Sequence, residues 1–200
     1  MPVSPTTEQI EASLRWWVAL GSGLTPSMVQ PANSGQPAPN EDYATLLMVR
    51  DSQPGKPVQR RVIGNDGDVD ETTIAVVRGR YSVQWYRDGA ADRASQFRVW
   101  VYSTRGRHAA LTGLTPYPGP ESYHGIGGDF APFTMMRLTG PQRIDAIISD
   151  AEEPRYTATL DIQYVQTVDA TIQRFVETDI ILSDGIGPEH LISIMEELPA

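Results

Sequence analysis

The sequence predicts an α+β fold: a twisted, mostly antiparallel sheet with a long β-hairpin, flanked by an N-terminal helix, a central helix and a short C-terminal helix. Apolar residues recur at helical spacing behind a capping sequence near the N-terminus. Several later segments alternate apolar and polar residues, which is the period of a strand. One of them, from about Arg155 to Val168, is far longer than an ordinary strand. We expect a single domain over residues 1–200 with its core in about 40–182.

The first helix is predicted from Thr6 to Leu20. Thr6 and Gln9 fit a capping box, in which each side chain accepts a hydrogen bond from the other residue's backbone N–H. Gly21 is expected to end the helix. Trp16 lies off the apolar stripe, so it is either a packing residue on a second face or an anchor for a neighbouring subunit. The stripe itself consists of Ile10, Leu14, Trp17 and Val18.

Three strands are expected before the central helix. Residues 21–42 are rich in glycine and proline and predict a long extended connection. Tyr43 to Arg50 is mostly apolar, which predicts a strand buried on both faces. Val58 to Ile63 predicts a short, basic edge strand. Thr72 to Tyr86 alternates clearly, and Gly79 within it suggests a bulge or a bend.

The central helix is predicted from about Ala90 to Ser103, with Gly106 closing it. Residues 105–134 are again rich in glycine and proline, and a loop of that length is either flexible or ordered by a partner. The expected buried stripe of the helix is Ala90, Ala94, Phe97 and Val101.

The long hairpin is predicted from Arg143 to Val168, with a turn at Asp150–Pro154. Its second strand alone would reach about 45 Å at about 3.3 Å per residue. An isolated domain of this size gains little stability from such a strand, whereas a protein that extends its sheet toward neighbouring copies gains more. The last element is a short helix predicted over residues 188–198, because Pro188 suits a first helical position.

Composition excludes several classes of function. The chain carries 16 basic and 25 acidic residues, a net charge of −9, and so lacks the basic footprint of a nucleic-acid-binding protein. It has no cysteine, which excludes disulfides, thiolate catalysis and cysteine–zinc sites. No apolar run spans a bilayer and no secretory signal is visible, so we expect assembly in the cytoplasm of a cell and no membrane partner.

No set of residues predicts catalysis or a cofactor. Asn65–Glu71 has oxygen ligands in the manner of a calcium loop, but lacks the glycine and the distal glutamate of that spacing, so a solvated acidic turn is the better interpretation. Glu152 and Glu153 are interpreted as charges at an exposed turn, with nothing to raise a pKa. The histidines, which show no metal-ligand spacing, are His108, His124 and His190.

A run of short motifs does resemble a known family. In chain order they are Val83-Gln84-Trp85-Tyr86 at a strand end; Ala94, Phe97 and Trp100 in a helix; Arg155-Tyr156 after Glu153-Pro154; Tyr164-Val165; and Ile172, Phe175 and Val176. In order and spacing, about residues 40–182 resemble the phage neck terminator family, also described as tail terminator or tail-completion proteins. The 105–134 loop and the helix at 188–198 depart from the family's pattern.

The resemblance implies a structural virion protein of the phage neck or tail, not an enzyme. Members of such a family form a hexameric ring that caps the tail tube, ends its polymerisation and joins it to the head-side connector. The implied partners are further copies of the chain, the tail tube protein and a head-completion or collar protein. DNA would pass through the lumen without specific binding, and the acidic balance predicts a lumen that is acidic or neutral.

Ring closure requires two different patches that meet between neighbouring copies. We expect the 143–168 hairpin, and secondarily the 105–134 loop, to supply them. The residues expected at the interface with subunits or partners are Trp16, Phe130, Phe133, Arg143, Asp145, Glu152, Glu153 and Arg155.

Other functions remain open at the level of sequence. The chain could be another virion component, such as a head-completion or collar adaptor or a minor tail protein, and the copy number of its ring would separate these. A buried polar cluster around His108 or His124 would instead favour a small-molecule enzyme. A generic interaction domain is a further alternative.

Overall fold

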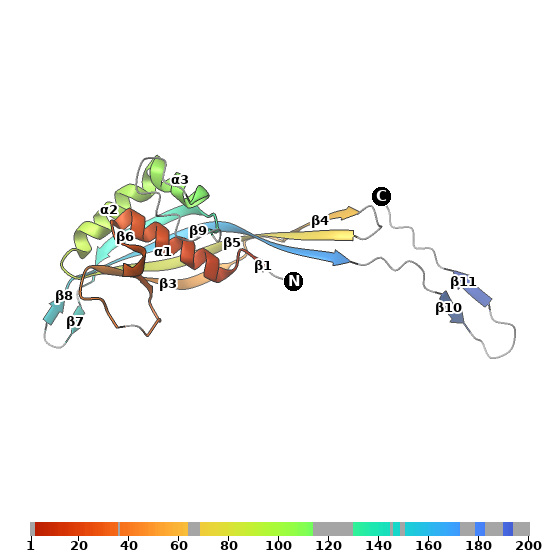
Figure 1. Ribbon diagram of the computed structural model, residues 1–200, viewed down its shortest axis with the longest axis horizontal. Helices are drawn as coiled ribbons and strands as arrows, with labels where there is room; N and C mark the ends of the chain where they lie inside the picture. Colours follow the sequence, from red (N-terminus) through yellow and green to blue (C-terminus); the bar gives the residue numbers. More distant parts are fainter. Residues whose placement is uncertain are drawn as a thin grey trace.

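A seven-stranded sheet carries three helices on one face and forms the body of the subunit in the computed structural model (Figure 1). The structure describes residues 3–35, 37–63, 69–113, 130–144, 146–148, 151–172, 179–182 and 190–193. Its elements are β1 Val3–Ser4, α1 Thr7–Ser22, η1 Pro26–Met28, β2 Val29–Pro31, β3 Tyr43–Ser52, β4 Val58–Ile63, β5 Val69–Tyr86, α2 Ala90–Tyr102, α3 Thr104–Thr112, β6 Thr134–Arg143, β7 Ala146–Ile148, β8 Ala151–Glu153, β9 Arg155–Ile172, β10 Asp179–Leu182 and β11 His190–Ser193.

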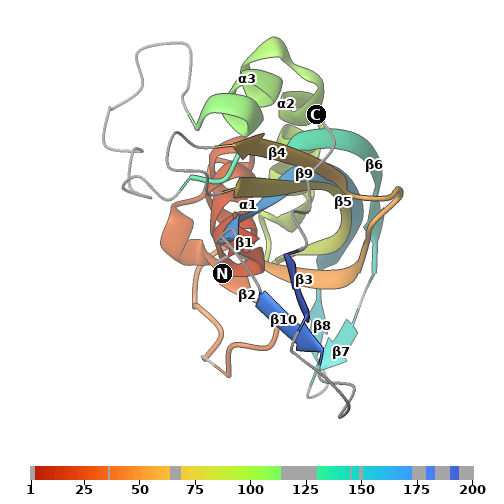
Figure 2. The same cartoon turned by 90° about the vertical axis from the view of Figure 1, so that its right-hand side faces the viewer.

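The two central strands, β5 and β9, are 18 residues long and pair antiparallel over their whole length. In the body, β3 continues the sheet beside β5, and β6 continues it beside β9. Beyond the body, β4 takes the place of β3, and β1 takes the place of β6. Among the strands that the structure describes, β2 alone pairs parallel, with β3. The sheet of the body curves around the helices when the molecule is seen along its long axis (Figure 2).

The predicted long strand is therefore confirmed, but its main partner differs from the one expected. Its neighbour along its full length is β5, which is distant in sequence. The hairpin partner β6, Thr134–Arg143, contacts only the first half of β9. Residues 146–148 and 151–153, which lie between these strands, pair with each other as β7 and β8.

Helix α1 begins as predicted and ends later than predicted. Thr6 is the N-cap, and both hydrogen bonds of the capping box with Gln9 are present. The cap residue at the other end is Gly23, whose φ of 65° is left-handed, and not Gly21. Gly21 lies inside the helix, where the rings of Phe97 and Trp100 come too close for a side chain.

The core is aromatic and lies between the helices and the sheet. The indole of Trp17 packs edge-on against Phe97 and Phe133 and beside Trp100. Its N–H donates to the carbonyl oxygen of Gly106 at 2.8 Å. Because a buried indole N–H needs a partner, this bond ties α1 to α3. The predicted stripe of α2 is buried as expected: Ala90, Ala94, Phe97 and Val101.

Helix α3 corrects the prediction of a loop from residue 105 onward. Ser103 caps it by accepting a hydrogen bond from the N–H of Gly106, so Gly106 lies in its first turn and does not close α2. Residues 134–143 also belong to a strand, β6. The predicted connection at 21–42 likewise contains η1 and β2. These segments are short or interrupted by register shifts, so they lack a clean period in the sequence.

Two further expectations about strands need correction. β3 is buried only over its first half, Tyr43–Leu46, and Val49 is 56% exposed. Of the bulge or bend expected at Gly79, the bulge is absent, since the pairing of β5 with β9 runs through this residue without a shift. The bulge lies in the neighbouring strand, between Met48 and Arg50.

The C-terminal helix predicted over residues 188–198 is also wrong where the structure describes the chain. His190–Ser193 form β11, which pairs antiparallel with β10. In this ladder Leu191 and Ile192 lie opposite Ile181 and Ile180.

The environment of Gly21 leads to a stability prediction. Replacing glycine by alanine inside a helix ordinarily stabilises it by about 1 kcal/mol. In Gly21→Ala the new Cβ would stand 2.6 Å from the Trp100 ring and 2.8 Å from the Phe97 ring. We therefore expect a net destabilisation of about 1–3 kcal/mol, measured by urea unfolding. The control Gly55→Ala, with no atom within 4 Å of the new Cβ, should change the free energy of unfolding by less than about 0.5 kcal/mol. A stabilised Gly21→Ala variant would contradict the packing of α1 on α2.

Candidate assembly surface

The face of the sheet opposite the helices is polar and open. Alternation along β5 and β9 sends one set of side chains into the core, including Tyr81, Val83, Leu160 and Ile162, all fully buried. The other set faces away from the helices. In the body it consists mainly of Arg78, Arg80, Ser82, Gln84, Thr157, Thr159, Asp161 and Gln163.

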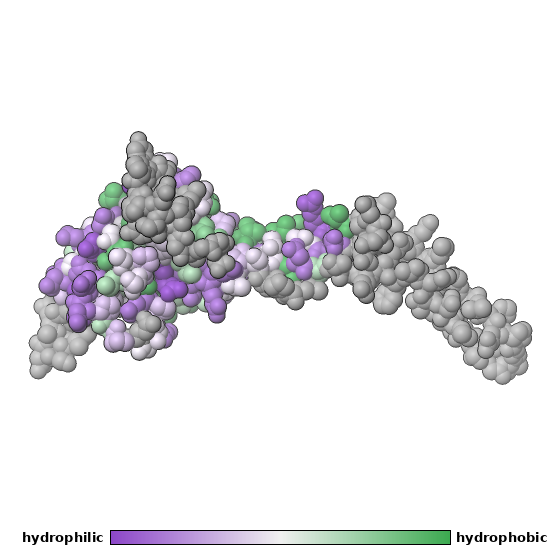
Figure 3. Space-filling model, viewed as in Figure 1, coloured by the Kyte–Doolittle hydropathy of each residue, from purple (hydrophilic) through white to green (hydrophobic). Residues whose placement is uncertain are grey.

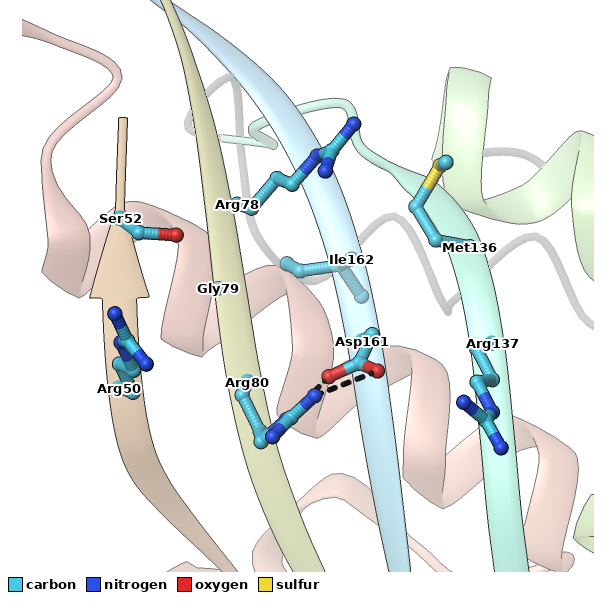
Figure 4. Close-up of a pocket in the computed structure, with 9 residues that line it drawn as sticks. All are labelled: Arg50, Ser52, Arg78, Gly79, Arg80, Met136, Arg137, Asp161 and Ile162. Carbon is cyan, nitrogen blue, oxygen red and sulfur yellow. Dashed lines mark hydrogen bonds and ion pairs between the residues drawn. The ribbon is translucent and has the colours of Figure 1, made fainter. Parts of the chain in front are cut away.

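Three arginines and one aspartate form a single row across this open face. In the strand register, Arg50 of β3 lies opposite Arg80 of β5, and Arg80 lies opposite Asp161 of β9. Asp161 in turn lies opposite Arg137 of β6. Neighbouring strands lie about 4.8 Å apart, so the row spans about 15 Å. A fourth arginine, Arg78, stands in the next row. Figure 4 shows these side chains in front of the sheet, with the helices behind it. Because Arg78 stands beside that row on the same face, we include it and use the name arginine row for Arg50, Arg78, Arg80 and Arg137.

Two β-bulges turn the outer arginines onto this face. The pairing of β3 shifts between Met48 and Arg50, and that of β6 shifts between Met135 and Arg137. One extra residue in a strand reverses which face the following side chains occupy. In regular register, Arg50 would oppose Gly79, and Arg137 would oppose Leu160, both on the helix side of the sheet. The bulges therefore place both arginines in the open row, one from each side.

The row carries a net positive charge. Arg80 donates two hydrogen bonds to the Asp161 carboxylate, at 2.6 and 3.2 Å. The hydrogen bond and the negative charge of Asp161 raise the pKa of Arg80. Within the described part of the chain, no carboxylate forms an ion pair with Arg50, Arg78 or Arg137. These side chains line a shallow depression of about 370 Å³.

Beyond the helices, the sheet continues as a narrow arm. We define the arm as β4 together with residues 69–76 of β5 and 165–172 of β9; it projects from the body in Figure 1. Hydrophobic residues reach its surface, as Figure 3 shows. The arm ends in carboxylates on both long strands, with Asp70 and Glu71 on β5 and Asp169 on β9. Its large exposed apolar side chains are Val58, Val62, Val76 and Val165.

The aromatic residues expected at an interface lie within the subunit. Trp16 is 4% exposed and packs edge-on against Phe130, which is half-buried. Phe133 is 2% exposed and packs on Trp17. Of the two interpretations of Trp16, a packing residue on a second face of α1 describes its place in the single chain. The part of the 105–134 loop that the structure describes folds back onto α1.

Two charged residues of the predicted set, Arg143 and Arg155, lie at the end of the open face opposite the arm. Arg143 ends β6 and is exposed, next to the start of β9. The guanidinium of Arg155 stacks over the Tyr86 ring at 5.0 Å. Glu152 and Glu153 belong to β8, and their side chains lie outside the described residues, as does Asp145.

Sequence reasoning missed the arginine row. The spacing of Arg78 and Arg80 within one alternating strand was a usable signal, because it places both on the same face. Arg50 and Arg137 gave no such signal, since their facing depends on bulges, and β6 was not predicted as a strand.

The described residues hold no group of three or more metal-ligating side chains. His108 is exposed on α3, whereas His124 and most of Asn65–Glu71 lie outside the described residues. No described helix has the length and apolar character needed to cross a membrane.

Two buried tyrosines on the helix side of the sheet make the stability of the subunit dependent on pH. The hydroxyl groups of Tyr81 and Tyr164 have no hydrogen-bond partner among the described residues. Burial, and secondly the charges of nearby groups that include Glu11 and Asp51, raise the pKa of both above the ordinary value near 10. The folded state therefore holds these protons more tightly than the unfolded state.

We expect the free energy of unfolding to fall as pH rises above about 10, because the unfolded chain ionises there first. In Tyr81→Phe this fall should be smaller, while stability near neutral pH should be unchanged or raised, since an unpaired buried hydroxyl is removed. Urea unfolding at neutral and alkaline pH measures both effects, and Tyr102→Phe, at an exposed position, serves as the control. An alkaline loss that is equal in all three proteins would contradict the assignment.

Comparison with known proteins is informative for the N-terminal part of the chain. A family model described as phage neck terminator protein matches residues 8–119, which is more than half of the chain. The match begins earlier and ends earlier than the resemblance drawn from the sequence, and it covers β2 to β5 and all three helices. No curated protein matches the chain.

Proposed function

We propose a specific role for this chain from the premise that it belongs to the phage neck terminator family, whose members have a structural role in the virion. Six copies form a ring that caps the completed tail tube and ends its polymerisation. The opposite side of the ring joins the tail to the head-side connector, through a head-completion or collar protein. The ring is assembled in the cytoplasm of the bacterial host and has no catalytic role.

The observation that carries this proposal is the arm. A sheet of two or three strands is only marginally stable in water unless something covers one of its faces. The described helices cover the body, yet the ladder of β5 and β9 continues for eight further residue pairs, 69–76 with 165–172. Val58, at 65% exposed, and Val165, at 48%, remain in contact with solvent there. Such an extension gains stability when neighbouring copies cover it.

Heterologous contacts, in which one patch meets a different patch on the next copy, close a ring when the rotation between copies is right. The arm is one such patch, and the open face of the body, together with the sheet end opposite the arm, is a different one. At that opposite end, Arg143, Arg155 and the β7–β8 hairpin, with Asp145, Glu152 and Glu153, are our candidates for contacts with subunits or partners. The 105–134 segment is a secondary candidate.

The net charge of −9 supports a passive role toward DNA. A polyanion is repelled by an acidic wall and slides past it without specific binding. We therefore propose that the surface facing the lumen is acidic or neutral, and that the arginine row is not part of it.

Light scattering tests the proposal directly on the purified protein, alone and mixed with tail tube protein. We expect particles of six copies, at least when the tube is present. Val165→Asp, which charges the arm, should reduce assembly by about tenfold or more, since an unpaired charge at an interface costs several kcal/mol. Val99→Asp, on the exposed side of α2, is the matched control and should assemble as the wild type does.

A protein that stays monomeric with tube present would contradict the proposal. A ring that follows the symmetry of the head-side portal would instead favour a head-completion adaptor.

A further inference from the structure

We infer that the arginine row receives the carboxylates at the end of the arm of a second copy of this chain. The inference rests on the proposed assembly and names the two surfaces that meet in it. Asp70 and Asp169 at the end of one arm face Arg78 and Arg137 on the body of the next copy.

The row has the features of a constructed site. Bulges are sites where a strand re-aims a side chain, and here one bulge on each side of the β5–β9 pair turns an arginine onto the same face. Four of the 16 basic residues of the chain converge on one depression in this way. In a protein with a net charge of −9, this concentration of positive charge opposes the general balance, so a specific acidic partner is expected.

The partner's chemistry follows from the row itself. Guanidinium groups bind carboxylates through paired, charge-assisted hydrogen bonds, as Arg80 already does with Asp161. Asp161 holds Arg80 in place, while Arg50, Arg78 and Arg137 line the same depression without an ion pair to a described carboxylate. The aspartate at the centre of the row would repel the phosphates of DNA, which favours separate carboxylates placed around it over a continuous polyanion.

The end of the arm offers such carboxylates. Asp70, Glu71 and Asp169 line one small depression there. The Asp169 carboxylate accepts a hydrogen bond from the Thr72 hydroxyl at 2.7 Å, which holds it beside β5. The unbroken register of β5 with β9 places Asp70 and Asp169 on the same face as the arginine row. Glu71 lies on the other face, where it pairs with Arg61 at 2.8 Å, so Asp70 and Asp169 are the groups we assign to the contact.

The two surfaces cannot meet within one copy. Asp70 and Arg80 are ten residues apart on one strand, and Asp161 and Asp169 are eight residues apart on the next. At about 3.3 Å per residue these separations are about 33 and 26 Å. The pairing of β5 with β9 has no break between them, so the arm has no hinge at which to fold back. Contact between these charges therefore requires a second copy.

Charge exchange tests the contact on the full-length protein in the presence of tail tube. The double variant Arg78→Glu/Arg137→Glu should weaken assembly by at least about tenfold, because close interfacial charge pairs couple by about 1.5 kcal/mol or more. Asp70→Arg/Asp169→Arg should weaken it similarly. The variant with all four substitutions should recover assembly, because the charges are then exchanged. Arg98→Glu/Arg105→Glu, at exposed positions of α2 and α3, changes the net charge by the same amount as the first double variant and controls for it.

A cross-link gives a second measurement that does not depend on affinity. The chain has no cysteine, so a disulfide can form only where cysteines are introduced. An equal mixture of Arg137→Cys and Asp169→Cys proteins should form a disulfide-linked dimer under mild oxidation, since disulfides need Cα atoms within about 7 Å. A mixture of Arg98→Cys and Asp169→Cys should not.

The outcomes separate this inference from the proposed function. If the wild type fails to assemble even with tube, the proposed function fails and the inference fails with it. If the wild type assembles while both charge-reversed variants assemble equally well and no cross-link forms, only the inference is overturned. A row whose reversal abolishes DNA binding and leaves assembly intact would also overturn it, because the row would then be a surface for nucleic acid.

Discussion

The uninterrupted pairing of β5 with β9 is the constraint on which the rest of the structure depends. Eighteen consecutive residue pairs join two strands that are far apart in sequence. At one end this ladder carries the helices and the aromatic core, and at the other end it continues alone as the arm. Because a continuous ladder resists sharp bending, it holds the arginine row and the carboxylates of the arm about 30 Å apart. A subunit built in this way presents complementary charges that it cannot bring together by itself.

Small irregularities in the flanking strands give the open face its charge. Without the bulges at Val49 and Met136, the side chains of Arg50 and Arg137 would point toward the helix side, where a guanidinium would need a buried partner. The core is intact beside both bulges, because Leu46, before the bulge of β3, and Leu138, after the bulge of β6, are buried. The fold thus places four arginines on one surface of an acidic protein, while the aromatic residues remain inside the subunit.

Local patterns in the sequence were sufficient where they are regular. The capping box of Thr6 and Gln9, the stripe of α2 and the alternation of β9 were all confirmed. Elements without a regular pattern were missed: α3 is tied to α1 by the bond from Trp17 to Gly106, and two register shifts interrupt the alternation of β6. The arginine row could not be predicted for the same reason, since bulges reverse the facing of its outer members. For Trp16 the sequence left two interpretations, and in the single chain its ring packs edge-on against Phe130.

We propose that the arm is an assembly element which neighbouring copies cover. Amide hydrogen exchange, measured in the free protein and in the complex with tail tube, reports the local opening of backbone hydrogen bonds. We expect the amides of residues 58–63, 69–76 and 165–172 to exchange readily in the free protein and to become protected in the complex, whereas those of the helix-covered strands change little. Equal exchange of the arm amides in both states would contradict it.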